Sequence, residues 1–302
     1  MAITFLILCY LIWGLLPIYW KQLQHIAPLE VLFHRIVWSF FFYGLAMLAI
    51  NIFTKKKISS SFAELKNDRK LWGKLFLSSF MITGNWFTYI YAVNSGQILQ
   101  ASLAYYISPL ISVVAGAIIY KEQLSMRTRW ALAFCGLGVF LLIFGQSLMY
   151  GDAPKVPWLA LWLAISFFIY GFVKKSVVMP AITSSFIEGL FFVLPAIYFI
   201  VFSSYSHLAL YTSRDWVLFI LGGVATGLPL VFFSYAAQKL TFSSIGFFQY
   251  LSPTLQLMTA IFIYGEDFSI QKIAAFSCIW LGVAFYISQL IKQNKKIIKQ
   301  RR

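Results

Sequence analysis

Residues 3–20, which read ITFLILCYLIWGLLPIYW, form an apolar run without one charged side chain. About 20 apolar residues in a helix cross the hydrocarbon core of a bilayer, so this run predicts a membrane-spanning helix. Similar runs recur along the chain, which is 61% hydrophobic and 11% charged and has a mean hydropathy of +0.80. Soluble domains are usually about 45 to 50% apolar. The sequence therefore excludes a water-soluble globule and predicts an all-α polytopic membrane protein.

Ten apolar runs are long enough to span a membrane and are bounded by charged or turn residues. We expect transmembrane helices at residues 3–20, 29–53, 72–93, 99–120, 128–147, 157–176, 181–203, 215–237, 243–264 and 270–291. The spans form two groups of five, in residues 1–150 and 151–291, and residues 292–302 form a basic tail.

The distribution of basic residues predicts the orientation of these spans. A net charge of +15 in a soluble protein would suggest a nucleic-acid partner, but here the Lys and Arg residues lie between apolar runs, where they act as topology signals. Most of the 24 lie on the side of the N-terminus, including the loop at 54–74, Lys174, Lys175 and the basic tail. Because cytoplasmic loops are enriched in Lys and Arg, we expect both termini to be cytoplasmic and no nucleic-acid partner.

The chain carries no pattern typical of a metal site, a cofactor or an enzyme. Cys9, Cys135 and Cys278 lie in separate apolar runs without metal-ligand spacing, which favours inert buried thiols. There is no His, Asp or Glu cluster of metal spacing, no glycine-rich phosphate loop and no nucleophile elbow in the sequence. We therefore expect neither metal nor cofactor, and no ATP-driven pump unless a partner supplies the ATPase.

An internal repeat is visible in two short stretches. Residues 106–110 read YISPL and residues 250–254 read YLSPT, 144 positions later. The same offset matches Glu122 with Glu266, and a weaker match with a different shift sets Glu30 against Glu188. Because each half has five spans, an odd number, the second half begins on the opposite side of the membrane. The sequence thus predicts two inverted five-helix repeats, an arrangement that many secondary transporters use.

These motifs resemble the EamA-type ten-helix proteins of the drug/metabolite transporter superfamily. The resemblance rests on the interval from Pro109 to Glu122, on the interval from Pro253 to Glu266, and on the block of residues 30–39, which holds Glu30 and the run HRIVWS at 34–39. It covers nearly the whole chain. It implies a multi-pass permease of the bacterial inner membrane and does not indicate a substrate.

Ionisable side chains inside the predicted spans are the first candidates for a substrate pathway, since they are costly in a membrane. Glu30 and His34 are four residues apart and share a helix face, whereas Arg35 points about 100° away from His34. We expect these three side chains to border the outer approach to a cavity between the two halves. The alternatives are a structural ion pair or interfacial snorkelling, and Glu188 in the second half has the same two readings.

The prolines of spans four and nine are the second group of candidates. Pro109 and Pro253 each remove one backbone hydrogen bond and free a carbonyl four residues earlier, on Tyr105 and Gln249; a packing kink is the alternative. Polar and aromatic neighbours that could line one cavity are Asn85, Tyr89, Gln100, Tyr105, Tyr106, Gln249, Tyr250 and Gln256. Glu122 and Glu266 follow at helix ends, where we expect helix capping or gate closure, and Ser125 and Ser269 are expected N-caps.

The sequence thus favours a secondary transporter of a small organic solute or drug-like metabolite that works by alternating access. Its expected partners are the solute and membrane lipids, with protons as the candidate coupling ion. The alternative is a lipid-modifying membrane enzyme that uses Glu30, His34 and Arg35 as a head-group site. Substrate identity, transport direction and oligomeric state are not encoded in these patterns.

Overall fold

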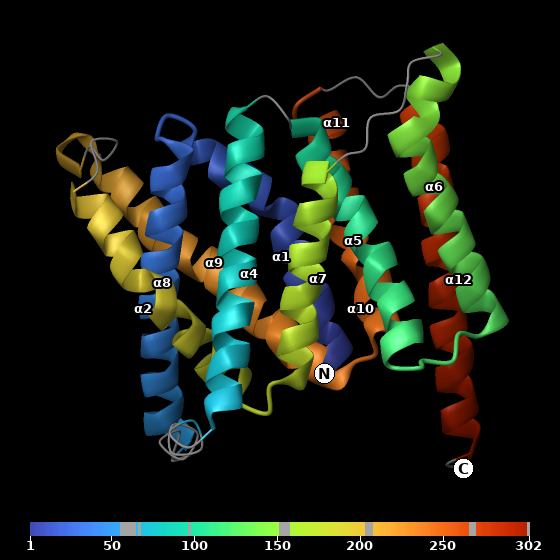
Figure 1. Ribbon diagram of the computed structural model, residues 1–302, viewed down its shortest axis with the longest axis horizontal. Coiled ribbons are helices and arrows are strands. Elements are labelled where there is room, and N and C mark those ends of the chain that lie inside the picture. The colour runs from blue at the N-terminus through green and yellow to red at the C-terminus, as the bar shows by residue number, and fades with distance from the viewer. Residues whose placement is uncertain are drawn as a thin grey trace. The chain divides into compact units, whose positions relative to one another are not determined.

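The protein is described by a computed structural model that covers residues 1–54, 65, 68–95, 98–150, 158–202, 208–265 and 270–300. Within these ranges the regular structure is helical, with no strand. In chain order the elements are α1 (Ala2–Trp20), η1 (Lys21–Leu23), α2 (Pro28–Thr54), α4 (Arg69–Asn94), α5 (Ile98–Ile119), α6 (Met126–Tyr150), α7 (Trp158–Ser176), α8 (Ala181–Phe202), η2 (Leu208–Leu210), α9 (Ser213–Lys239), α10 (Phe242–Gln249), α11 (Leu251–Phe262) and α12 (Ile270–Gln300) (Figure 1).

Seven helices of the described ranges are long and apolar enough to cross a membrane, and α5 contains a shorter apolar segment, Leu103–Ile119. The chain is therefore a multi-pass membrane protein. One expectation needs correction, because the predicted span 243–264 is two helices, α10 and α11, that meet at Tyr250. Pro253 lies in the first turn of α11, where a missing N–H is tolerated. Pro109, in contrast, lies inside a continuous α5.

Several helices begin where their sequence provides a cap. The side chain of Ser125 accepts a hydrogen bond from the backbone N–H of Thr128 at 3.2 Å, which confirms Ser125 as the cap of α6. Thr212 and Asp215 form a complete capping box at the start of α9, so two N–H groups of the first turn are satisfied reciprocally. Ser269 lies outside the described residues.

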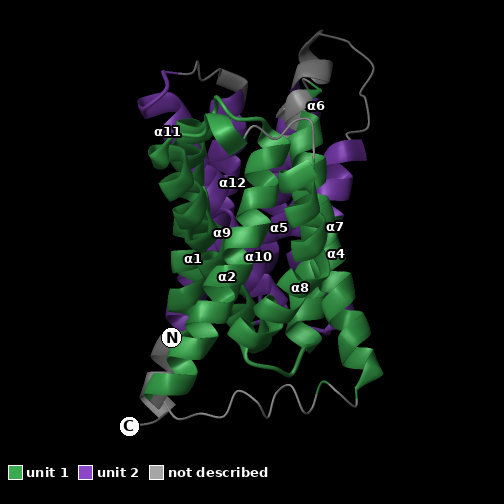
Figure 2. Cartoon of the chain, turned by 90° about the vertical axis from the view of Figure 1, so that its left-hand side faces the viewer, with its two compact units in different colours: residues 1–96, 166–240 green, residues 97–165, 241–302 purple. Residues whose placement is uncertain are grey.

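The chain divides into two compact units, shown in different colours in Figure 2. Unit 1 comprises residues 1–96 and 166–240, and unit 2 comprises residues 97–165 and 241–302. Each unit therefore takes helices from both predicted halves of the chain. Unit 1 holds α1, α2, α4, α8, α9 and most of α7, and unit 2 holds α5, α6, α10, α11 and α12.

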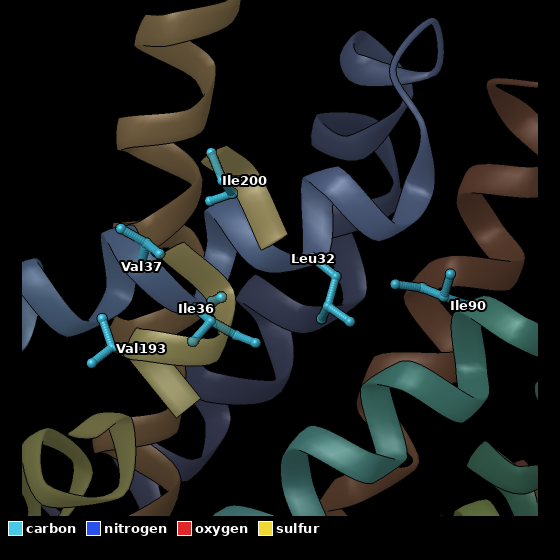
Figure 3. Packing of buried hydrophobic residues seen from close by; sticks show 7 residues of the cluster. Leu32, Ile36, Val37, Ile90, Val193 and Ile200 are labelled. Atoms are coloured by element: carbon cyan, nitrogen blue, oxygen red, sulfur yellow. The ribbon is translucent and has the colours of Figure 1, made fainter. Parts of the chain in front are cut away.

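In unit 1, α2 lies between α8 and α9 and provides much of the apolar core. One buried cluster consists of Leu32, Ile36, Val37, Ile90, Val193, Ala196 and Ile200, most of which Figure 3 labels. Its residues come from α2, α4 and α8. These three helices pack around the stretch of α2 that also holds His34 and Arg35.

In unit 2, α6 and α12 cross closely at two glycines. A Cβ atom on Gly138 would lie 2.6 Å from the carbonyl oxygen of Ala275 and 2.6 Å from Cγ1 of Ile279. A Cβ atom on Gly282 would lie 2.5 Å from Sγ of Cys135 and 2.7 Å from the carbonyl oxygen of Ala131. Side chains larger than hydrogen are therefore excluded at both glycines, and the two helices pack backbone to backbone.

Candidate functional site

Arg35 lies among four helices of unit 1. Its guanidinium carbon is 4.6 Å from the ring centre of Trp20 on α1 and 4.8 Å from that of Trp86 on α4. Its Nε donates a hydrogen bond to Oγ1 of Thr226 on α9 at 3.1 Å. A planar guanidinium suits this position because it can stack on aromatic faces and donate in its own plane. The geometry fixes a partly buried positive charge between two indole rings.

His34, one residue earlier on α2, faces a different environment. Its ring is 2% exposed and stacks on Phe219 of α9, with ring centres 3.8 Å apart and planes 10° apart. Trp216 contacts the same ring edge-on, with a centre distance of 5.6 Å. Nε2 of His34 is buried without a hydrogen-bond partner among the described residues. His34 therefore lies in an aromatic layer between α2 and α9.

Glu30, one turn before His34, is also buried, with 1% of its surface exposed. Its backbone N–H donates to the carbonyl oxygen of Ala27 at 2.9 Å in the first turn of α2. The three residues expected to act together thus lie close along one helix, but His34 faces Phe219 whereas Arg35 faces the two indoles.

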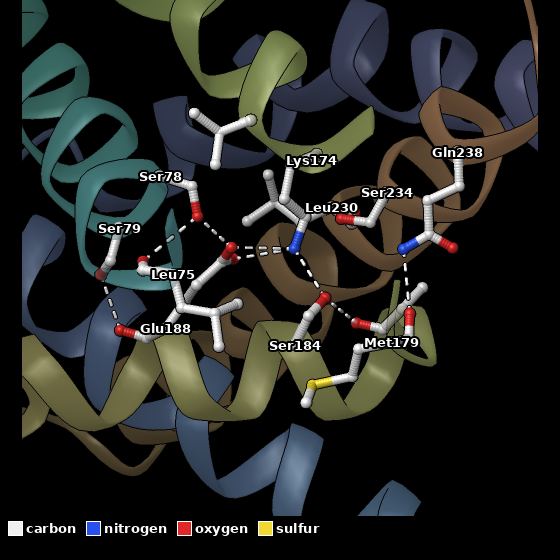
Figure 4. A network of polar contacts seen from close by, with 12 residues as sticks. Leu75, Ser78, Ser79, Lys174, Met179, Ser184, Glu188, Leu230, Ser234 and Gln238 are labelled. Atoms are coloured by element: carbon white, nitrogen blue, oxygen red, sulfur yellow. Dashed lines mark hydrogen bonds and ion pairs between the residues drawn. The ribbon is translucent and has the colours of Figure 1, made fainter. Parts of the chain in front are cut away.

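Unit 1 contains a buried ion pair between Lys174 and Glu188, which we call the Lys174–Glu188 pair (Figure 4). Nζ of Lys174 on α7 donates to both carboxylate oxygens of Glu188 on α8, at 2.9 and 3.0 Å. It also donates to Oγ of Ser184 at 2.8 Å. The hydroxyl of Ser78 on α4 donates to Glu188, and the hydroxyl of Ser79 donates to the Glu188 carbonyl oxygen at 2.7 Å. Three helices thus converge on one carboxylate.

This pair corrects the expectation for Lys174. The charge distribution along the sequence predicts a loop cation on the cytoplasmic side at Lys174, but its side chain is fully buried. The missed signal is the short interval between α7 and α8, which lets the long stem of Lys174 reach Glu188 in the next helix. Lys175 behaves differently, because it donates to the carbonyl oxygens of Ala237 and Leu240 at the end of α9.

Two further candidates of unit 1 lie on α4. Nδ2 of Asn85 donates to Oγ of Ser166 on α7 at 2.9 Å, so this amide joins two helices. Tyr89 is 36% exposed. Tyr89 also interacts electrostatically with Arg35.

In unit 2 the predicted proline-centred residues do come together. Nε2 of Gln249 donates to Oγ of Ser108 at 2.9 Å, and Oε1 of Gln249 is buried without a partner among the described residues. The hydroxyl of Tyr250 donates to the Tyr106 carbonyl oxygen at 3.3 Å. The hydroxyl of Tyr106 donates to the Pro253 carbonyl oxygen at 3.4 Å. These bonds join α5 to the break between α10 and α11.

The remaining members of this group are placed as follows. Tyr105 is half-buried on α5, and Nε2 of Gln256 donates to Oγ of Ser252 at 3.4 Å. The side chain of Gln100 lies outside the described part of the chain, as does Glu266.

Glu122 caps a helix of the other predicted half. Its carboxylate accepts hydrogen bonds from the backbone N–H groups of Phe242 and Ser243, at 2.7 and 3.0 Å, and from the Ser243 hydroxyl at 2.6 Å. A carboxylate at this position satisfies free N–H groups and complements the helix dipole of α10. Glu122 therefore ties the segment after α5 to the start of α10.

The described residues contain no group of three or more His, Cys, Asp or Glu side chains that could hold a metal ion. What the geometry offers is a set of buried charged and aromatic groups in unit 1 and a hydrogen-bonded helix break in unit 2. Such groups can hold a solute or an ion by hydrogen bonds, charge and stacking.

Comparison with known proteins agrees with the family that the sequence motifs indicate. Residues 1–144 match the EamA-like transporter family. The chain is 37% identical to "Uncharacterized transporter YojE" of Bacillus subtilis, over 95% of this chain and 93% of that protein. It is 36% identical to "Protein RarD" of Escherichia coli, over 96% and 95% of the two chains. A solved crystal structure shares the fold, with a TM-score of 0.68 at 17% identity over 94% of this chain and 96% of its own. The chain therefore belongs to the EamA-like transporter family, among its RarD-type members.

Proposed function

We propose that this protein is a secondary transporter that moves a small organic solute across the bacterial inner membrane by alternating access between two inverted repeats. The transporter class is supported by the relatives, one of which is named an uncharacterized transporter. The alternating-access mechanism depends on the relation between the two halves of the chain.

One observation carries the repeat, namely the reciprocal contacts between α6 and α12. Gly138 meets Ala275 and Ile279, and Gly282 meets Ala131 and Cys135. Adding 144 to each residue of α6 gives its counterpart on α12, so the two contacts are the same contact seen from either helix. A two-fold axis produces such pairs, as in an isologous interface. An accidental crossing of two apolar helices has no reason to do so.

Contacts between residues 144 apart support the same axis. Sγ of Cys135 lies 3.6 Å from the carbonyl oxygen of Ile279, its own counterpart, and Tyr250 donates to the carbonyl oxygen of Tyr106. A residue that touches its own counterpart lies beside the axis. The residue numbers rise along α6 as they fall along the contacting part of α12, so the two helices run antiparallel, as inverted repeats require.

In unit 1 the contacts between α2 and α8 favour a slightly different offset between the two halves. Phe40 of α2 stacks on Phe186 of α8 with ring centres 4.7 Å apart. Gly44 contacts Phe186, and Gly189 contacts Phe40. This nearly reciprocal pattern supports an offset of 146 residues, which sets Glu188 against Phe42. The weaker match of Glu30 with Glu188 is therefore not retained in this proposal.

The proposal places both termini on the cytoplasmic side and gives the solute contact with the buried polar groups of unit 1. The Arg35 environment is the main candidate, since a cation held between two indoles and a hydroxyl can bind a polar or aromatic solute.

The test is transport by purified protein in proteoliposomes, screened over amino acids, nucleotides and amphipathic drugs with and without a pH gradient. We expect saturable uptake or efflux of at least one class, and loss of that transport in Arg35→Gln. Protein-free vesicles are the control. Folded protein that moves no member of the panel in either direction would contradict a transport function.

A further inference from the structure

The Lys174–Glu188 pair is not explained by stability alone. Replacing a buried ion pair by apolar residues is often neutral or stabilising, so such a pair is weak evidence for a purely structural role. Intramembrane ionisable pairs frequently mark ion pathways and proton relays. The pair also belongs to one half only. The offset of 157 residues that matches Gly14 with Gly171 sets Lys174 against Pro17. The offset of 146 residues given above sets Glu188 against Phe42.

An asymmetric pair has a consequence in a transporter built from two related halves. Alternating access moves one repeat or bundle against the other. Glu188 lies where the two halves meet, because Lys174 of α7 and Ser78 of α4 both contact its carboxylate. The mechanism requires this movement to separate Lys174 from Glu188 in one of the two access states.

The two partners respond differently to separation. Lys174 lies two residues before the end of α7 at Ser176, and its long stem can carry the ammonium toward the helix end, as lysines near membrane interfaces do. Glu188 is the eighth residue of α8 and has a short side chain, so it stays at its depth. There the hydroxyl of Ser78 remains beside it. An ionised carboxylate without a counter-charge is strongly disfavoured in such surroundings.

We propose that Glu188 is a proton-binding site, occupied by a proton when Lys174 withdraws and by the Lys174 ammonium when it returns. On separation, one carboxylate oxygen of Glu188 forms an O–H bond with a proton taken from water, while Lys174 keeps its charge at the aqueous end of α7. On return of Lys174 that proton leaves to water. The proposal rests on the transport function above, and it makes a proton the coupling ion.

The other groups that face the pair do not compete for this role. Tyr170 on α7 has its ring centre 5.8 Å from Nζ of Lys174, and Tyr43 on α2 interacts electrostatically with Glu188. Tyrosine phenols are neutral over the physiological pH range. From α9 and α4 the neighbours are the hydroxyls of Ser234, Ser78 and Ser79, and the ammonium of Lys74 donates to the Ser176 carbonyl oxygen beyond Lys174. Cys9 of α1 lies behind Tyr170 as a buried thiol.

The first experiment measures the proton itself, by infrared spectroscopy of purified protein from about pH 5 to about pH 9, the range in which buried carboxyl groups titrate. We expect the Lys174→Met variant to show one more protonated carboxyl group than the wild type at neutral pH. That signal should shift with isotope-labelled glutamate and be absent from Lys174→Met/Glu188→Gln. Lys174→Arg, which keeps the charge, should lack it. A Lys174→Met spectrum without the extra carboxyl signal would overturn the proposal.

The second experiment follows protons during transport, with a pH-sensitive dye inside proteoliposomes. Wild-type protein should move protons together with solute, and Glu188→Gln should move solute without protons. Proton-coupled transport by Glu188→Gln overturns the proposed site and leaves the transport function standing. If no solute moves at all, the transport function fails, and the infrared result on Lys174→Met still decides whether Glu188 binds a proton.

Discussion

The close crossing of α6 and α12 predicts that Gly282→Ala destabilises the protein. The new methyl group would lie 2.5 Å from Sγ of Cys135 and 2.7 Å from the Ala131 carbonyl oxygen. A rotation of Cys135 can relieve the first contact, but the second is with the backbone of another helix, so α6 and α12 must separate. Overpacking of this kind costs about 1–3 kcal/mol. Alanine recovers about 0.5–1 kcal/mol through its higher helix propensity, so we expect a net loss of about 1 kcal/mol and at most about 2.5 kcal/mol.

The chain offers a matched control on the same pair of helices. A Cβ atom on Gly136 of α6 has nothing within 4 Å, so Gly136→Ala should be neutral or stabilising by up to about 1 kcal/mol. Gly138→Ala, the counterpart of Gly282→Ala, should cost as much as Gly282→Ala. Equal losses at these two glycines would support the two-fold relation between α6 and α12.

The assay is equilibrium unfolding in mixed micelles, followed by tryptophan fluorescence and fitted for the unfolding free energy. The order of the three unfolding free energies is the predicted quantity, and it is independent of the absolute stability in detergent. If Gly282→Ala and Gly136→Ala are equally stable, the close backbone contact of α6 with α12 does not exist as described.

Four further predictions concern single side chains and orientation. His34→Phe should keep the unfolding free energy within about 1 kcal/mol of the wild type, because it preserves the stacked ring and removes a buried nitrogen without a partner. A large destabilisation would contradict the aromatic environment of His34. Loss of transport with stability retained would assign His34 a functional role. Glu122→Gln should lower the unfolding free energy by about 1 kcal/mol, since it removes the charge at the start of α10, and no loss would argue against capping. Arg35→Lys should lower it by about 1 kcal/mol, because lysine does not reproduce stacking between two indoles; the same denaturant titration checks this, and wild-type stability would count against it. In intact cells an impermeant thiol reagent should label Ser206→Cys and not Ser60→Cys; the reverse labelling would invert the orientation.

Much of the fold could be predicted because membrane helices reveal themselves locally. Apolar length and flanking charges place α1, α2, α6, α8 and α9 within a few residues of their bounds. The interruption of the ninth span at Tyr250 was not predicted, although Pro253 pointed to a local weakness there. A proline removes one hydrogen bond, but whether the helix continues depends on neighbours. Pro109 has a similar local sequence and lies in an unbroken α5.

The candidate site was harder to predict, because it depends on which helix faces which. Helix geometry correctly separates the directions of His34 and Arg35, but it does not identify Phe219 and the two indoles as their neighbours. Lys174 was misjudged because a lysine near a helix end is usually hydrated. Its stem can extend toward either the water or the protein interior, and only the position of Glu188 on the next helix decides between them.

The mixing of both halves within each compact unit also bears on how the chain is made. Unit 1 is complete only after α9 has been synthesised, and unit 2 only after α12 has been synthesised. For example, Cys135 of α6 contacts Ile279 of α12, and α2 packs against α9. Early helices must therefore reside in the bilayer as separate inserted segments before they find their neighbours. A product that stops near residue 150 would contain portions of both units and a complete set of neither. Nascent chains of this protein thus lack part of the packing partners of each unit until synthesis is nearly finished.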